Sequence, residues 1–234
     1  MKNIKQTKTE QVKRVFDDAF DKYDLMNDLM SLGIHRIWKG RLIDWMNPKK
    51  GDRLIDMASG TGDIARSFLE RIQFEGEATC VEPNKLMFNY GKKKLKKYKK
   101  IKWHCSMAEK LPFKNESFDL YSVSFGIRNF SNIDISLKEA RRVLKMGGRI
   151  LCLEFSKVEN ELLNRIYKFY SKSIPHLGKY ITGKSEPYEY LVESIENFYN
   201  QDELLEIFKK NGFEKVEYRN LSGGIVAIHS GWKI

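Results

Sequence analysis

Two acids that flank a glycine turn are the residues of this sequence best suited to holding a nucleoside. Asp56 lies in an apolar run of strand length, and the turn Ser59–Gly62 follows it and opens a helical pattern. Gly60 and Gly62 permit backbone angles and a close ligand approach that a Cβ atom would block, and the free N–H groups of the new helix face the turn. Glu82 ends a second apolar run about 20 residues later, where a carboxylate can accept hydrogen bonds from both ribose hydroxyls. The pattern predicts a site for an adenosine-type cofactor.

The acid before the turn distinguishes two such cofactors. The turn also matches G-x-G-x-x-A through Ala65, a pattern that suits NAD. However, Asp56 precedes Gly60 by four residues, where its carboxylate can meet the positive amino group of a methionine tail. Beside the pyrophosphate of a dinucleotide the same negative charge would be repelled. The residues therefore favour S-adenosyl-L-methionine, with NAD as the alternative.

Length and composition set the class of protein. With 234 residues the chain fits one α/β domain and can bury a full core. No apolar run reaches the roughly 20 residues that span a bilayer, and the N-terminus lacks the apolar core of a signal peptide. The three cysteines, Cys80, Cys105 and Cys152, are scattered in or beside apolar runs and are expected to be buried thiols. The four histidines show no metal-ligand spacing. We expect a soluble, cytoplasmic, metal-free protein.

The positive charge is concentrated in one run. The net charge is +11, and Lys92–Lys102 holds eight lysines and no acid, so the rest of the chain carries 11 − 8 = +3. A nucleic-acid surface would typically bring arginines and stacking aromatics as well, so no nucleic-acid partner is expected. Two interpretations remain open: a solvated helix end, or peripheral contact with an anionic membrane surface at about 1 kcal/mol per lysine.

The elements that position these residues follow an alternating order. Residues 10–46 have apolar positions at three- and four-residue spacing, which predicts helices up to Asn47-Pro48. From Leu54 onward, apolar runs of strand length alternate with helical patterns, as expected of a parallel sheet with right-handed crossovers. The predicted strands begin at Leu54 and Ala78 and cover Ile101–Cys105, Phe118–Phe125 and Arg149–Phe155; the predicted helices cover 63–72, 85–97 and 133–144, the last stopped by Gly147-Gly148.

The pattern changes after Phe155. An aromatic-rich helix over Leu162–Ile174 is expected to end at Pro175 and to lead into a less regular stretch. Further helices are predicted over 190–198 and 202–211, and the apolar runs 213–221 and 224–232, joined through Ser222-Gly223-Gly224, predict a hairpin. A mainly parallel sheet that ends in an antiparallel hairpin is the seven-stranded, Rossmann-like α/β layout of class I S-adenosylmethionine methyltransferases. We expect one domain over 1–234, in which 1–50 form a helical cap and 156–198 a helical insertion over the substrate site.

Three segments carry a resemblance to a known family. They are YDLMNDLMSLGIHRIW at Tyr23–Trp38, RVLKMGGRILCLEFS at Arg142–Ser156, where Met146 replaces the usual proline, and YLVESIENF at Tyr190–Phe198. With the ending GIVAIHSGWKI, they resemble the C-methyltransferases of ubiquinone and menaquinone biosynthesis over nearly the whole chain. The ending and LCLEFS are more similar to the ubiquinone-making branch.

The resemblance implies a set of cofactor residues. By position these are Thr61, Glu82, Met107, Ala108 and Ser124, with Met107-Ala108 at the adenine and Ser124 beside the methionine portion. The chain departs from the family at two of these positions and also at Ser59 in the glycine turn. Ser59 stands where glycine is common, Glu82 where aspartate is common, and Met107 where asparagine is common. In the roof, Glu186-Pro187-Tyr188 replaces the common Asp-Ser-Tyr.

The resemblance also implies a reaction, methyl transfer to a ring carbon of a polyprenylated benzoquinol, with demethylmenaquinol as a second acceptor to consider. Arg128 and Asn129, in the loop after the fourth strand, are the predicted catalytic residues: Arg128 as electrostatic partner of a phenolate, and both as holders of a water that accepts the proton. Tyr23 is the third candidate, and its side chain is expected to point from the N-terminal cap toward the quinol oxygens. The simpler interpretations are a loop-stabilising Arg128 and a packed Tyr23.

The implied partners are a polyprenyl quinol and either a second copy of the chain or a quinone-biosynthesis complex. The segments Leu25–Leu32 and Ile166–Ile174 are candidates to line a groove for the polyprenyl tail. The alternative functions are methylation of another small lipid or phenol, an NAD-linked oxidoreductase, and a non-catalytic scaffold for quinone assembly.

Overall fold

A single seven-stranded sheet forms the centre of the computed structural model, which describes residues 10, 12, 14, 15, 17 and 23–234, without the side chains of Tyr23, Asp24, Met26 and Thr182. The strand order is β3-β2-β1-β4-β5-β7-β6, and only β7 runs antiparallel to its neighbours. The strands are β1 (Arg53–Met57), β2 (Glu77–Val81), β3 (Ile101–His104), β4 (Phe118–Ser124), β5 (Leu144–Phe155), β6 (Glu214–Leu221) and β7 (Val226–Trp232). The predicted fold class is confirmed.

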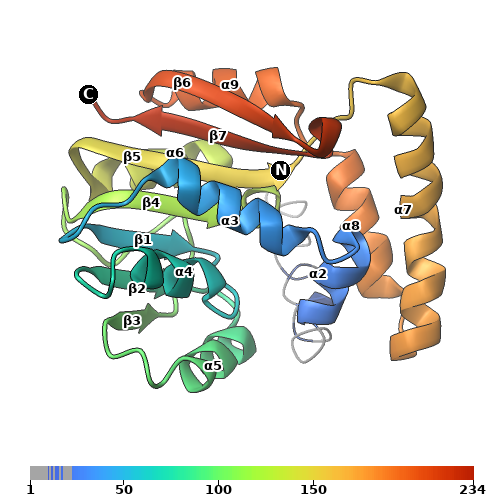
Figure 1. Ribbon diagram of the computed structural model, residues 1–234, viewed down its shortest axis with the longest axis horizontal. Coiled ribbons are helices and arrows are strands. Elements are labelled where there is room, and N and C mark those ends of the chain that lie inside the picture. Colours follow the sequence, from blue (N-terminus) through green and yellow to red (C-terminus); the bar gives the residue numbers. More distant parts are fainter. Residues whose placement is uncertain (1–9, 11, 13, 16, 18–22) are drawn as a thin grey trace.

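Helices cover both faces of this sheet (Figure 1). Because strand side chains alternate between faces, Leu54 packs with one group of helices and Ile55 with the other. The first face is covered by α3 (His35–Met46) and α4 (Asp63–Arg71), and the second by α6 (Ile133–Val143) and α9 (Gln201–Lys210). Helix α5 (Lys85–Lys94) lies beside β3. Two cores, one on each face, hold the sheet rigid and fix the positions of its strand ends.

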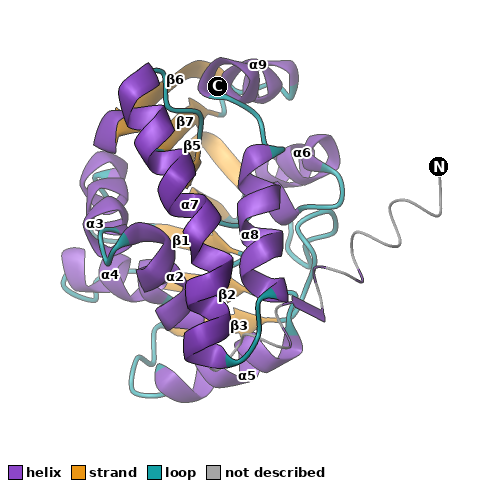
Figure 2. Cartoon of the chain, turned by 90° about the vertical axis from the view of Figure 1, so that its right-hand side faces the viewer, coloured by secondary structure: helices purple, strands orange, loops and turns teal. Residues whose placement is uncertain are grey.

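Three helices form a roof beyond the carboxyl ends of the parallel strands. They are α2 (Tyr23–Ser31), α7 (Glu161–Thr182) and α8 (Glu186–Glu196). Figures 1 and 2 show α7 as the outermost element on this side, with α8 and α2 between it and the sheet. No helix in the described part of the chain is long and apolar enough to cross a membrane.

Helix α7 continues through Pro175, so the prediction that it ends there is wrong. Proline cannot donate a hydrogen bond to the carbonyl of residue 171, but the turns on either side are held by packing. Ile174 is fully buried, and Gly178 lies so close to the ring of Tyr188 in α8 that a Cβ atom would come within 2.2 Å of it. The helix ends instead at Gly183, whose φ of +79° is typical of a C-terminal cap.

Two smaller predictions are also wrong. Helix α6 ends at Val143, and Leu144 already pairs with Phe118 of β4, so Gly147-Gly148 lie inside β5 and not at a helix end. Their backbone groups exchange hydrogen bonds with Lys233. Cys105 is exposed because β3 ends one residue earlier, whereas Cys80 and Cys152 are buried as expected.

Candidate active site

The glycine turn lies between β1 and α4, at the centre of the sheet edge. Gly60 and Gly62 adopt φ values of +54° and +84°, as does the preceding Ala58 at +52°. A Cβ atom on Gly62 would lie 2.6 Å from the Leu95 side chain and 3.2 Å from the indole of Trp103. The predicted freedom of Gly62 thus serves close packing against α5 and β3, and it is not among the residues that line the two pockets described below.

Glu82 connects the turn to the end of β2. Its Oε2 atom accepts a hydrogen bond from the Gly60 N–H at 2.9 Å, and its Oε1 atom accepts one from the Asn84 N–H at 2.8 Å. Asn84 in turn caps α5 by accepting from Leu86 and Met87 N–H groups. Burial raises the pKa of Glu82 to about 7. Since a carboxylate offers about four acceptor directions, Glu82 can hold the turn and still meet a ribose.

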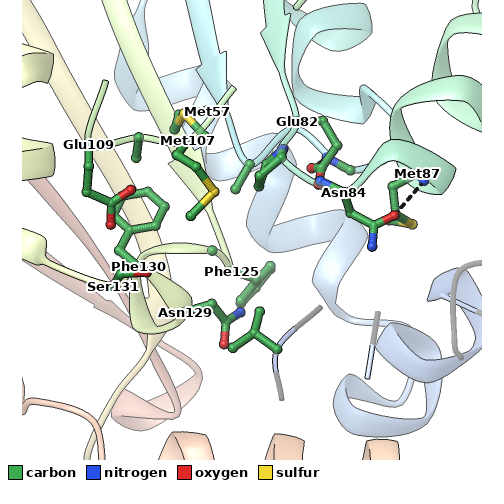
Figure 3. Close-up of a pocket in the computed structure, with 16 residues that line it drawn as sticks. Met57, Glu82, Asn84, Met87, Met107, Glu109, Phe125, Asn129, Phe130 and Ser131 are labelled. Atoms are coloured by element: carbon green, nitrogen blue, oxygen red, sulfur yellow. Dashed lines mark hydrogen bonds between the residues drawn. The ribbon is translucent and has the colours of Figure 1, made fainter. Parts of the chain in front are cut away.

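The larger pocket opens beside this carboxylate (Figure 3). Figure 3 shows Glu82 and Asn84 on one side of it and Met107, Glu109 and Phe130 on the other. Its lining is mostly apolar, which suits the faces of an adenine ring, and the acid stands where ribose hydroxyls need an acceptor. Of the predicted cofactor residues, this pocket is lined by Gly60, Glu82, Met107 and Ala108.

A smaller pocket is lined by three further predicted cofactor residues, Asp56, Thr61 and Ser124. It shares Ala58 and Phe125 with the larger one. Three buried oxygens around it, Asp56 Oδ2, Ser59 Oγ and Ser124 Oγ, lack a hydrogen-bond partner within the described part of the chain. The other Asp56 oxygen accepts from Ser122 Oγ at 2.7 Å, and burial raises the pKa of Asp56 to about 7. Buried polar atoms left without partners indicate a polar ligand.

Lys39 supplies a cation to the same pocket and was missed by sequence reasoning. Its side chain extends from α3 into the lining of this pocket, and its Nζ atom lies 3.1 Å from Asp63 Oδ2. Lys94 donates to Thr61 Oγ1 at 3.0 Å and lies 3.4 Å from the other Asp63 oxygen. Burial tends to raise the pKa of Asp63, but the two lysines lower this pKa to about 2. One feature of the sequence could have indicated it, because Lys39 directly follows the Tyr23–Trp38 motif.

The two pockets together fit S-adenosylmethionine. The larger, apolar pocket with Glu82 can take the adenosine part. The smaller pocket can take the zwitterionic amino-acid part, with Asp56 facing the ammonium group and Lys39 the carboxylate. Bound there, the cofactor supplies an electrophilic methyl group on a positively charged sulfur.

Arg128 and Asn129, predicted as a catalytic pair, lie in the 3₁₀ turn η2 (Ile127–Asn129) but face different pockets. Asn129 lines the larger pocket, and its Oδ1 atom accepts a hydrogen bond from the Tyr190 hydroxyl of α8 at 2.9 Å. Arg128 lines a separate, more polar pocket between η2 and α8. Its buried guanidinium donates to Glu154 Oε1 at 2.6 Å and to the Phe125 carbonyl at 2.8 Å.

The remaining candidate, Tyr23, begins α2, but its side chain lies outside the described part of the structure. The pairing of Arg128 could not be read from the motif because Glu154 lies in β5, 26 residues away. The geometry gives the guanidinium a role in holding the loop, because its Nε atom also donates to Ser194 Oγ of α8 at 3.3 Å and the backbone N–H of Arg128 donates to Glu154 Oε2 at 3.5 Å.

A glycine turn at the switch point of a seven-stranded sheet with an antiparallel β7, together with these two pockets, defines a class I S-adenosylmethionine-dependent methyltransferase. Solved structures share the fold. A SAM-dependent methyltransferase from Aquifex aeolicus aligns with a TM-score of 0.65 at 16% identity, covering 92% of this chain and 97% of that one. A Haemonchus contortus phosphoethanolamine N-methyltransferase 2 in complex with S-adenosyl-L-methionine aligns with a TM-score of 0.64 at 16% identity, covering 84% of this chain and 52% of that one.

The chain belongs to the ubiE/COQ5 methyltransferase family, whose model matches residues 1–233. Proteins named ubiquinone/menaquinone biosynthesis C-methyltransferase UbiE are similar over almost their full length. The one from Rickettsia akari is 50% identical, covering 95% of this chain and 92% of its own, and the one from Ruegeria sp. is 46% identical, covering 97% and 92%. The resemblance seen in the sequence and the predicted cofactor are confirmed.

Proposed function

We propose that this chain methylates a ring carbon of a polyprenylated benzoquinol, or of the related demethylmenaquinol, with S-adenosylmethionine as methyl donor. The names of its relatives and one feature of the site support this. Asn129 stands in the wall of the cofactor pocket and is hydrogen-bonded to Tyr190 of the roof. A polar group is thereby fixed between the methyl donor and the space under α8, where an acceptor ring can enter.

The chemistry requires a reduced quinol. An aromatic carbon becomes a good nucleophile only when a neighbouring ring hydroxyl loses its proton, and the site must stabilise the phenolate that results. In our proposal Asn129 and Arg128 hold this oxygen and a water that accepts the proton, and Tyr23 approaches from the cap. Because Tyr190 donates to the Asn129 oxygen, the amide N–H₂ group is left as a donor toward the acceptor.

Arg128 has a more limited part in this proposal than an isolated arginine would. Glu154 offsets much of its charge, and the Nε atom of Arg128 donates to Ser194 of α8, so its main contribution is the position of the loop. Positioning can be worth several kcal/mol of a maximum of roughly 7–11 kcal/mol when donor and acceptor are held in line. The pair Arg128–Glu154 therefore acts mainly by fixing where Asn129 stands.

The polyprenyl tail needs an apolar path away from the ring. A cleft under α7 offers the side chains of Met30, Val192 and Ile195 on one part of its wall, beside polar and charged side chains that include Lys168 and Lys172. It shares Asn197 with the pocket that Arg128 lines. We propose that the tail leaves through this cleft, which includes parts of both segments, 25–32 and 166–174, that the sequence suggested for it.

We further propose that the protein works in the cytoplasm and contacts the inner face of the membrane through Lys92–Lys102. Two of the eight lysines in this run, Lys94 and Lys102, pair with Asp63 and Glu77, which leaves 8 − 2 = 6 for such a contact. Six lysines at about 1 kcal/mol each would give a reversible association that salt weakens.

The test is methyl transfer to a panel of acceptors with labelled S-adenosylmethionine. Reduced methoxy-polyprenyl-benzoquinol and demethylmenaquinol are compared with their oxidised quinones and with simple phenolic lipids. Product labelled on ring carbon from the quinols alone supports the proposal. Transfer to phenolic lipids, with none to either quinol, would replace it with the alternative function. Asn129→Ala should lose most turnover while binding S-adenosylhomocysteine within a few-fold of the natural chain.

A further inference from the structure

Helix α7 carries a row of exposed apolar side chains along its outer face. Leu162, Ile166, Phe169, Leu177 and Tyr180 recur at intervals of four, three, eight and three residues, which places them on one stripe of an α-helix. Phe169 is 82% exposed and Tyr180 is 91% exposed. The helix has 22 residues and is therefore about 33 Å long. A stripe of this length goes well beyond the single exposed apolar side chains that are normal on a protein surface.

The opposite face of α7 already makes the contacts that hold the helix to the protein. Ser171 and Ile174 are buried, and Gly178 packs on Tyr188 of α8. On the α2 side, the Tyr170 hydroxyl donates to the Leu29 carbonyl. Figures 1 and 2 agree that no other described element lies outside α7. The stripe is therefore not part of the core of this fold.

A basic row runs along one border of the stripe. Arg165, Lys172 and Lys179 follow one another at seven-residue spacing and are exposed. With Lys168 and the single acid of the sequence 161–182, Glu161, the helix carries 4 − 1 = +3. An apolar stripe bordered by cations matches the interface of an anionic bilayer, where acyl chains lie beneath phosphates.

We propose that α7 docks this chain on an anionic lipid bilayer, lying in the plane of the interface with Phe169 and Tyr180 at the acyl boundary and the basic row on the lipid phosphates. Aromatic side chains favour this depth, and the stems of lysine and arginine can extend to the headgroups. A second copy of the chain fits less well, because an antiparallel pair of α7 helices would bring two basic rows together. Docking by α7 is separate from the methyl acceptor and also from the Lys92–Lys102 run, which contains no comparable stripe.

The direct test is binding of the full chain to sonicated vesicles of phosphatidylcholine with and without phosphatidylglycerol, with no quinol present. The variant Phe169→Ser/Tyr180→Ser should bind the anionic vesicles at least about tenfold more weakly, since it removes most of two large apolar side chains from the stripe. The matched control is Ile135→Ser/Met146→Ser, which removes two apolar side chains that are also exposed but lie in α6 and at the start of β5. It should bind as the natural chain does.

Charge and depth are tested separately. Arg165→Gln/Lys172→Gln/Lys179→Gln should lose binding to anionic vesicles and leave the weak binding to phosphatidylcholine unchanged. Phe169→Trp should show indole fluorescence that brominated acyl chains quench. Each variant is first checked for folding by circular dichroism and for binding of S-adenosylhomocysteine, so that a loss of vesicle binding is not caused by unfolding.

Two results would overturn the proposal. In the first, Phe169→Ser/Tyr180→Ser binds anionic vesicles as tightly as the natural chain, while Lys92→Gln/Lys93→Gln/Lys97→Gln abolishes binding; the lysine run would then be the docking element. In the second, sedimentation velocity shows a dimer that the same α7 double substitution dissociates, which would assign the stripe to a second copy. A failure to methylate quinols would leave the vesicle result unaffected, so this proposal and the proposed function can fail independently.

Discussion

Arg128 and Glu154 form a buried ion pair, 2.6 Å from Nη1 to Oε1, beneath the loop that connects β4 to α6. The same arginine also donates to the Phe125 carbonyl, and Glu154 accepts from the Phe155 N–H. The pair thus joins the end of β4 to the end of β5. The position of Asn129, the next residue along the loop, depends on it.

Breaking this pair should destabilise the protein strongly. Arg128→Met leaves a buried carboxylate without its counterion, and the free energy of unfolding should fall by about 3–5 kcal/mol. Burial raises the pKa of Glu154 even with Arg128 present; its stabilising contribution is therefore complete below the unfolded-state pKa near 4.5 and is lost as pH rises through the folded-state pKa. In Arg128→Met this loss should extend to higher pH. Urea unfolding across pH 4–9 measures both effects. Arg128→Met/Glu154→Gln should recover most of the stability, and no recovery would argue against the pair as the cause.

The two acids of the cofactor site should make the unliganded protein less stable as pH rises. Burial raises the pKa of Asp56 and that of Glu82 to about 7, from 3.8 and 4.5. A raised pKa means that stability is complete below about pH 4 and declines until about pH 7, above which it levels off. Thermal unfolding of the free protein should show this decline, and Asp56→Asn should reduce it. Because S-adenosylmethionine is positively charged, its binding should release protons near pH 6.5, which calorimetry in buffers of different ionisation enthalpy detects.

Lys39 should recognise the carboxylate of the cofactor. Removing a charge-assisted hydrogen bond costs about 1.5–3 kcal/mol, so Lys39→Met should weaken S-adenosylhomocysteine binding by roughly 10- to 100-fold. Two ligands provide the control. Methylthioadenosine lacks the amino-acid part, and decarboxylated S-adenosylmethionine lacks only the carboxylate; both should bind the variant and the natural chain equally. If the substitution weakens the binding of all three ligands equally, Lys39 acts instead by holding α3 in place through its ion pair with Asp63.

Gly126 should be needed because Ala58 faces it across the boundary of the two pockets. A Cβ atom on Gly126 would lie 2.6 Å from Ala58 Cβ. Gly126→Ala should therefore cost about 1–3 kcal/mol in overpacking and weaken S-adenosylhomocysteine binding about tenfold. Ala58→Gly/Gly126→Ala removes the clash and, since Ala58 has a positive φ, suits glycine at that position. Isothermal calorimetry on Gly126→Ala and on the double variant should show that the second substitution restores S-adenosylhomocysteine binding.

The sequence could predict those parts of the site that depend on residues close together in the chain, and it could not predict contacts between distant segments. The turn at Gly60, the acid at Glu82 and the loop at Arg128 follow strand ends, and the carboxyl ends of parallel strands meet at one edge of a sheet. Alternating apolar runs were therefore enough to place them together. The partner of Arg128 was not predictable in this way, because the burial of Glu154 is decided by β5 pairing with β4 and β7.

The roof was the least predictable part for the same reason. Proline normally ends a helix, and no local feature near Pro175 predicts otherwise. The contact between Gly178 and Tyr188, made between two helices, outweighs the missing hydrogen bond. Lys39 was overlooked because a lysine in a helix usually faces water; here α3 packs against α4, and Lys39 pairs with Asp63 at the start of that helix.

The place of β7 has a consequence for how the chain is made. This strand lies between β5 and β6, although both precede it in the sequence. During synthesis, β5 therefore leaves the ribosome with one hydrogen-bonding edge open, and this edge stays open until residues 226–232 have emerged. An apolar strand with an open edge is prone to pair with other chains. Nascent chains stalled before residue 226 should accordingly need chaperone protection, and the chain released after synthesis of residues 226–232 should not.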